Sequence, residues 1–150
     1  FIAMIFDGLD GRVARITNTQ SEFGAEYDSM ADMVSFGIAP GLVAYNFALS
    51  GMGKFGWLAA FVYVAAAALR LARFNTQVGV ADKRYFQGLA SPAAAGVKAS
   101  IIWVGTEYQI DGQEHGLIIG IITIVAGLLM VSNFRYNSLK KSIGKAKLTF

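Results

Sequence analysis

Long apolar segments with few charges limit most strongly how this chain can fold. Residues 55–69 contain no charged side chain, and residues 116–132 contain none either. Hydrophobic residues make up 55% of the 150 positions and charged residues only 15%, with a mean hydropathy of +0.48. This composition is too apolar for an ordinary soluble domain. It predicts an all-α polytopic membrane protein whose apolar segments are transmembrane helices.

The breaks between the apolar segments divide the chain into five predicted helices within one domain, residues 1–150. The first residue already lies in an apolar run, so we expect a fragment that begins partway through its first helix, residues 1–15. Ser91 and Pro92 are typical of a helix N-cap followed by proline at the first helical position. The other predicted helices are residues 24–49, 55–74, 91–106 and 116–132.

The basic residues are distributed unevenly between the two ends of these helices. If the chain crosses the membrane at each predicted helix, residues 7–24, 75–90 and 133–150 lie on one side. That side and its helix ends carry eleven of the thirteen Lys and Arg residues. Because cytoplasmic loops are enriched in Lys and Arg, we expect this side to face the cytoplasm, across the cytoplasmic membrane. The net charge of +3 therefore indicates orientation in a membrane and not binding to nucleic acid.

Four aspartates flank the first predicted loop, next to some of the most apolar sequence in the chain. Asp7 and Asp10 are three residues apart and Asp28 and Asp32 are four apart, so each pair shares one face of a helix. Because a short loop favours antiparallel neighbours, the two acidic faces can meet. Four converging carboxylates repel one another, and two divalent cations would cancel their charge. Oxygen ligands of this kind suit Mg²⁺ or Mn²⁺.

Residues with little or no side chain share these acidic faces. Gly11 and Ala14 follow Asp10, and Gly24 lies one turn before Asp28. They leave room for a nucleotide or a phosphate to approach the backbone. Two simpler interpretations stay open at this point: solvated acids paired with nearby arginines, or a transporter whose acids bind cations. A transporter would carry acids near the middle of the bilayer on several helices, whereas these lie at one end of two helices.

The spacing of these residues resembles the signature of the CDP-alcohol phosphatidyltransferases, D-x2-D-G-x2-A-R-x8-G-x3-D-x3-D. Every fixed position of that signature is occupied between Asp7 and Asp32. Within the family, the chain is most similar to the integral-membrane phosphatidylserine synthases. The segments that carry this second resemblance are residues 32–40, 69–75, 85–96 and 129–140.

The resemblance implies a reaction and a set of site residues. The family transfers a phosphatidyl group from CDP-diacylglycerol to an alcohol, here L-serine, and releases CMP. Asp7, Asp10, Asp28 and Asp32 would hold two divalent metal ions, and Asp32 would also act as the general base on the incoming hydroxyl. The residues that would contact the CDP part are Gly11, Ala14, Arg15 and Gly24.

Several side chains are candidates for binding the acceptor. Ser35, Arg70, Arg73 and Lys83 would bind the serine carboxylate or a phosphate. Anchoring at the membrane interface explains the two arginines equally well. With glycerol 3-phosphate or inositol phosphate as the acceptor, the same basic residues would form the additional pocket. Lys98, inside a predicted helix, would face a polar cavity or snorkel.

The resemblance also implies a six-helix fold that is commonly homodimeric. Five helical segments are recognisable here, so the start of the first helix and a sixth helix would lie outside this chain. The expected partners are CDP-diacylglycerol, L-serine, membrane lipids and a second copy of the chain, with the active site facing the cytoplasm.

Overall fold

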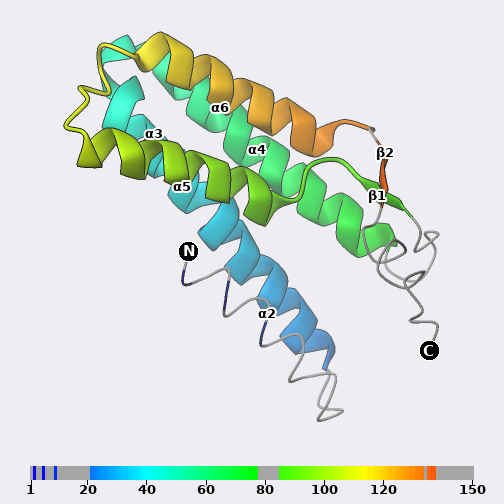
Figure 1. The fold of residues 1–150 in the computed structure, drawn as a ribbon. Helices are drawn as coiled ribbons and strands as arrows, with labels where there is room; N and C mark the ends of the chain where they lie inside the picture. The colour runs from blue at the N-terminus through cyan, green and yellow to red at the C-terminus, as the bar shows by residue number, and fades with distance from the viewer. Residues whose placement is uncertain are drawn as a thin grey trace, which may run out of the picture.

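The computed structural model describes residues 2, 5 and 9 and residues 21–77, 85–133 and 135–137. This part of the chain is a helical bundle with one short pair of strands (Figure 1). The elements are, in chain order, α2 (Glu22–Asp32), the π-helix η1 (Met33–Ile38), α3 (Ala39–Ala44), the π-helix η2 (Tyr45–Leu49), the 3₁₀-helix η3 (Ser50–Met52), α4 (Lys54–Gln77), β1 (Tyr85–Gln87), α5 (Ser91–Glu107), α6 (Gly116–Val131) and β2 (Arg135–Asn137).

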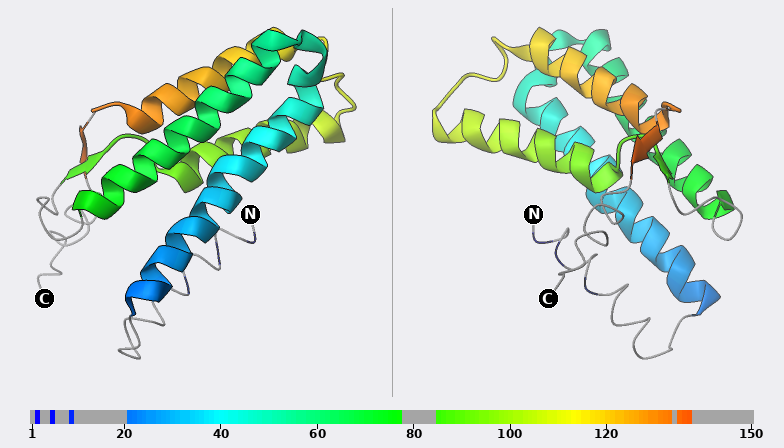
Figure 2. Two further views of the ribbon diagram at one scale, coloured as in Figure 1. Left: turned by 180° about the vertical axis from the view of Figure 1, so that it is seen from behind. Right: turned by 45° about the vertical axis from the view of Figure 1, so that its right-hand side comes forward.

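The predicted second helix is one long helical rod from Glu22 to Leu49, which Figure 2 shows crossing the bundle. The sequence predicts its length and its end, but not the two π-helical turns within it. The chain reverses through η3 and Gly53, whose φ of 56° is a left-handed conformation that glycine adopts without strain. The predicted break at residues 50–53 is therefore confirmed, and α4 returns alongside the rod.

Small residues allow α6 to pack closely along α4. A Cβ atom added at Gly127 would lie 3.2 Å from the Cα of Tyr63 and 3.4 Å from the Cβ of Ala66. Backbones that approach this closely are typical of helix packing within membranes. The buried residues of α6 recur every three or four positions along one face: Gly116, Gly120, Thr123, Gly127 and Met130.

The bundle buries small side chains and exposes large apolar ones. Its core cluster contains three alanines besides Tyr63 and Met130. Trp57, Phe61 and Leu69 of α4, by contrast, lie more than half exposed. An apolar surface this large requires an apolar environment, and two helical stretches, Phe23–Met52 and Lys54–Thr76, are long and apolar enough to span a bilayer. The all-α membrane fold predicted from the composition is confirmed.

The two strands close one end of the bundle. β1 and β2 are antiparallel, with Phe86 opposite Tyr136. No strand was predicted in either segment, which the sequence indicates only as a polar loop and a basic tail. The chain then turns at Gly88, whose φ is 76°, and the Leu89 N–H donates to the carbonyl of Leu129 in α6. These contacts hold the start of α5 against the end of α6.

Candidate active site at one end of the bundle

Helix α2 presents two of the four predicted metal ligands. The Ser21 hydroxyl caps the helix by accepting a hydrogen bond from the Gly24 N–H at 3.0 Å. Asp28 and Asp32 follow one helical turn apart, as their spacing predicts, with Asp28 exposed and Asp32 half-buried. Gly24 lies one turn before Asp28 and is exposed, so it leaves the backbone open on this part of the helix.

Arg70 of α4 lies between Asp32 and the start of α5. Its guanidinium interacts electrostatically with Asp32 and donates a hydrogen bond to the Ser91 hydroxyl at 3.0 Å. Ser91 is only 1% exposed, and the Nε of Arg70 is buried without a hydrogen-bond partner among the described residues. Arg70 is thus placed inside the bundle, beside an acid of the signature, and does not snorkel to the surface.

The prediction that Ser91 is a helix N-cap is wrong. The cap position of α5 is Ala90, Ser91 is the first helical residue, and Pro92 follows within the first turn. The Ser91 hydroxyl accepts a hydrogen bond from Arg70 and not from its own helix. A serine before a proline satisfies the local cap rule, but here a long-range partner determines what its side chain binds.

Two other polar side chains of α4 connect the same end of the bundle. Asn75 donates to the Ser29 hydroxyl of α2 at 3.0 Å. Arg73 donates to the carbonyl of Val131, at the end of α6, at 3.2 Å and to the side chain of Asn133 at 2.9 Å. Arg73 therefore satisfies a helix C-terminus, while its predicted role in acceptor binding stays a prediction.

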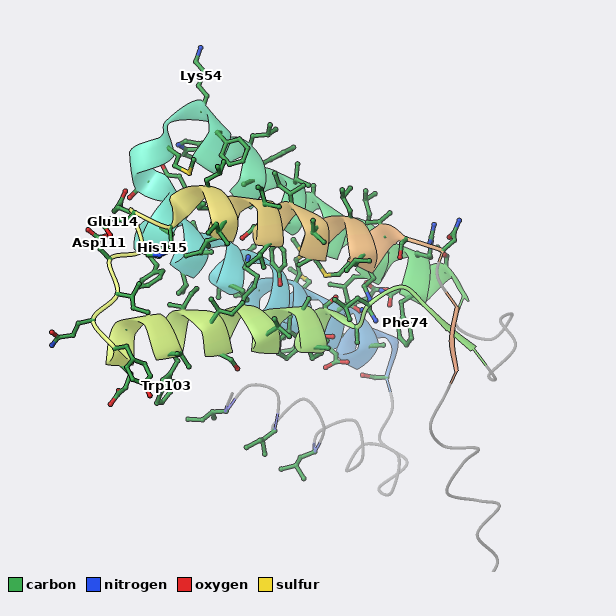
Figure 3. The ribbon with its side chains drawn as sticks, turned by 45° about the horizontal axis from the view of Figure 1, so that its top comes forward. Lys54, Phe74, Trp103, Asp111, Glu114 and His115 are labelled. Atoms are coloured by element: carbon green, nitrogen blue, oxygen red, sulfur yellow. The ribbon has the colours of Figure 1, made fainter. Side chains whose placement is uncertain are left out.

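These contacts lie at one end of the molecule. Figure 3 shows Phe74, which neighbours Arg73 and Asn75 in α4, opposite the end that carries Asp111, Glu114 and His115. Arg70 and Arg73 are among the predicted site residues, whereas Ser29, Asn75 and Asn133 are not. For Asn75, a polar side chain in the last turn of an apolar helix is a local signal; Ser29 and Asn133 carry no comparable signal.

Several predicted site residues lie outside the described residues, namely Asp7, Asp10, Gly11, Ala14, Arg15 and Lys83. Ser35 lies in η1, half-buried, one turn after Asp32. Within the described ranges, no group of three or more acids, histidines or cysteines could hold a metal ion, and only two of the four predicted ligands fall in those ranges. Asp28 and Asp32 are suitable metal ligands, because they are carboxylates on one face of one helix and are accessible to water.

Comparison with known proteins places this chain in a family. Residues 1–133 match the CDP-alcohol phosphatidyltransferases. The chain belongs to this family. A relative from Helicobacter pylori named CDP-diacylglycerol–serine O-phosphatidyltransferase is 42% identical over 147 residues, which are 97% of this chain and 62% of the relative.

Two further relatives carry the same name. The protein from Methanocaldococcus jannaschii is 41% identical over 136 residues, or 91% of this chain and 60% of its own length. The protein from Mycobacterium tuberculosis is 48% identical, with 87% of this chain and 47% of the relative covered. The chain thus spans less than two thirds of these phosphatidyltransferases.

Proposed function

We propose that this chain transfers a phosphatidyl group from CDP-diacylglycerol to the hydroxyl of L-serine, forming phosphatidylserine and CMP. The observation that carries the proposal is the similarity of nearly the whole chain to relatives named for this reaction. The intact signature from Asp7 to Asp32 supports it. So does the position of Asp28 and Asp32 at an end of the bundle where helices α2, α4, α5 and α6 are joined by polar contacts.

The carboxylates of Asp7, Asp10, Asp28 and Asp32 would hold two divalent metal ions, Mg²⁺ or Mn²⁺. When bound, the ions would neutralise the diphosphate of CDP-diacylglycerol and stabilise the departing CMP. Gly11, Ala14, Arg15 and Gly24 would lie against the CDP part.

Asp32 would act as the general base. The serine hydroxyl oxygen forms a bond to the phosphorus of the phosphatidyl group, its proton moves to the Asp32 carboxylate, and the bond from that phosphorus to the CMP oxygen breaks, with its electron pair leaving on CMP. The positive charge of Arg70 would partly compensate the negative charge of Asp32. Ser35, Arg70, Arg73 and Lys83 remain candidates for binding the acceptor.

The names of the relatives favour serine over an acceptor that carries a phosphate. Glycerol 3-phosphate or inositol phosphate is the alternative acceptor, for which Arg70, Arg73 and Lys83 would form the additional basic pocket. A cation transporter is disfavoured for a different reason. The acids in the described part of the chain lie in α2, residues 22–32, and at or after the end of α5, residues 107–114, and none lies between residues 33 and 77.

The chain is associated with a membrane, and we propose the cytoplasmic membrane with the Asp32 end on the cytoplasmic side. The uneven distribution of basic residues supports this orientation. CDP-diacylglycerol would enter from the bilayer and L-serine from the aqueous side, at the boundary where both are present. A homodimer is the expected assembly.

The test is an assay of CMP release by the purified chain in lipid, with CDP-diacylglycerol, Mn²⁺ or Mg²⁺, and either L-serine or glycerol 3-phosphate. We expect release with L-serine, its loss on chelation by EDTA, and its recovery when the metal is restored. Asp32→Asn should lower turnover by about 10²- to 10⁴-fold, the range for loss of a general base. Asp111→Asn, an exposed acid at the opposite end, is the matched control.

Two outcomes would contradict parts of the proposal. Faster CMP release with glycerol 3-phosphate than with L-serine would reassign the acceptor. No release with any alcohol, together with metal-dependent cation uptake into vesicles, would support the transporter.

A further inference from the structure

The helix that carries Asp32 changes its geometry directly after that residue. Residues Met33–Ile38 form a π-helical turn, η1, in which hydrogen bonds join each residue to the fifth one along the chain. Phe36 and Gly37, in the middle of this turn, are buried. Short π-helical segments are rare and occur often at functional sites.

The π-helical turn keeps one face of the rod against α4. Asp32 interacts with Arg70, and Gly37 lies against Ala67, with 3.1 Å between its added Cβ and that of Ala67. Gly41 lies against Val64. In an uninterrupted α-helix, nine residues at about 100° each would place Gly41 on the side opposite Asp32. The wider turn reduces this difference in direction, and Gly37 and Gly41 both lie against α4.

A buried tyrosine of α4 holds this turn. The Tyr63 hydroxyl donates a hydrogen bond to the carbonyl of Phe36 at 3.0 Å, and the Tyr63 side chain is fully buried. A buried carbonyl in apolar surroundings gains strongly from such a partner. The bond therefore connects the middle of η1 to α4, one turn beyond Asp32.

A buried lysine of α5 lies over the ring of the same tyrosine. The Lys98 ammonium is 3.4 Å from the centroid of the Tyr63 ring, and the residue is 3% exposed. Its Nζ has no hydrogen-bond partner among the described residues. Burying a lysine in this way is unfavourable, and the cation–π contact is the compensating interaction that the structure shows.

Helix α5 thus contacts α4 at two levels. Ser91 of α5 contacts Arg70 of α4. Lys98, seven residues after Ser91, contacts Tyr63, seven residues before Arg70. Since the helices are antiparallel, the two pairs lie one above the other. The pair of Arg70 and Ser91 lies beside Asp32. The pair of Tyr63 and Lys98 lies beside the carbonyl of Phe36.

We infer that Tyr63 and Lys98 are positioning residues for Asp32. Tyr63 holds the π-helical turn through the carbonyl of Phe36, and Lys98 holds the Tyr63 ring, so that the Asp32 carboxylate stays directed at the site beside Arg70. This inference rests on the proposed role of Asp32 in metal binding and base catalysis.

The experiment compares Tyr63→Phe, Lys98→Met and Lys98→Arg in the full chain in lipid nanodiscs. Four quantities are measured: Mn²⁺ affinity from the EPR signal of the free ion, kcat for L-serine, KM for L-serine, and amide hydrogen exchange of residues 33–41. Tyr45→Phe is the matched control, because Tyr45 lies in the other π-helix and its ring packs on Trp57.

We expect Tyr63→Phe and Lys98→Met each to weaken Mn²⁺ binding and lower kcat by about tenfold, the scale of one buried polar interaction, with KM little changed. Exchange of residues 33–41 should become faster. Lys98→Arg should recover most of the loss, since it keeps the cation over the ring. A lysine that only fills space would instead be replaced by methionine without loss.

Unchanged exchange and unchanged Mn²⁺ affinity in both Tyr63→Phe and Lys98→Met would overturn the inference. A wild-type chain that binds no Mn²⁺ and releases no CMP would refute the proposed function instead. The exchange data would still show in that case whether Tyr63 and Lys98 hold the π-helical turn.

Discussion

Arg70 is the residue whose role changes most between sequence and structure. As one of two arginines near the end of an apolar helix, it could anchor the helix in the interface or bind a substrate. In the fold it lies between Asp32 and the buried Ser91 hydroxyl. It therefore links three helices beside Asp32, the last of the signature acids.

Replacing Arg70 by methionine should affect both stability and turnover. Arg70→Met removes a charged hydrogen bond, which contributes about 1.5 to 3 kcal/mol, and leaves Asp32 without its compensating charge. We expect a lower thermal unfolding temperature in detergent and at least tenfold slower CMP release. Ser91→Ala is the control, because it removes only the acceptor of one bond and should leave turnover within a few-fold of the original. Equal turnover in Arg70→Met and the parent chain would contradict this role.

At the scale of elements, the contact between α4 and α6 depends on residues without side chains. The sequence shows that α6 is apolar all round, so its hydrophobic pattern does not indicate which face packs. The small residues at intervals of three and four do indicate it, and the structure places Gly127 of this face against Tyr63. This close packing also contacts the backbone of Tyr63, whose hydroxyl donates to the Phe36 carbonyl in the π-helical turn.

A bulky residue at Gly127 should separate the two helices. Gly127→Leu places a side chain where even a Cβ lies 3.2 Å from the Tyr63 backbone, and overpacking of this kind costs about 1 to 3 kcal/mol. We expect a lower midpoint of unfolding in an SDS titration. Val125→Leu adds bulk on the exposed side of the same helix and should leave the midpoint unchanged. A similar midpoint for both variants would show that α6 does not pack through this face.

At the scale of the whole molecule, the two ends of the bundle carry different charged residues. Figure 3 shows Phe74, which lies in α4 close to Arg70 and Arg73, opposite the end with the acidic loop, where Asp111 and Glu114 are exposed. A membrane protein with this asymmetry is oriented by its basic residues.

The absence of cysteine from the sequence makes this orientation directly measurable. In intact cells, a membrane-impermeant maleimide should label Glu114→Cys, at the end of the acidic loop. It should label Thr76→Cys, an exposed position near the end of α4, only after the cytoplasmic membrane is permeabilised. The reverse pattern would place the active site outside the cell.

The sequence by itself determined the helices from residue 24 onward, the breaks that separate them and the family. Bilayer segments must satisfy their backbone hydrogen bonds internally, so long apolar runs become helices. Glycines and polar residues end those helices at positions such as Gly53 and Ser50. The spacing of Asp28 and Asp32 is likewise a local property, and the structure retains it, whereas Asp7 and Asp10 stay predictions.

Only the tertiary structure decided which side chains meet. The bonds from Arg70 to Ser91, from Tyr63 to Phe36 and from Arg73 to Asn133 join residues 21, 27 and 60 positions apart. Periodicity describes one helix at a time and does not specify how two helices face each other. The π-helical turn after Asp32 is likewise invisible to periodicity, and its contacts with α4, through Gly37 and the carbonyl of Phe36, appear only when the helices pack.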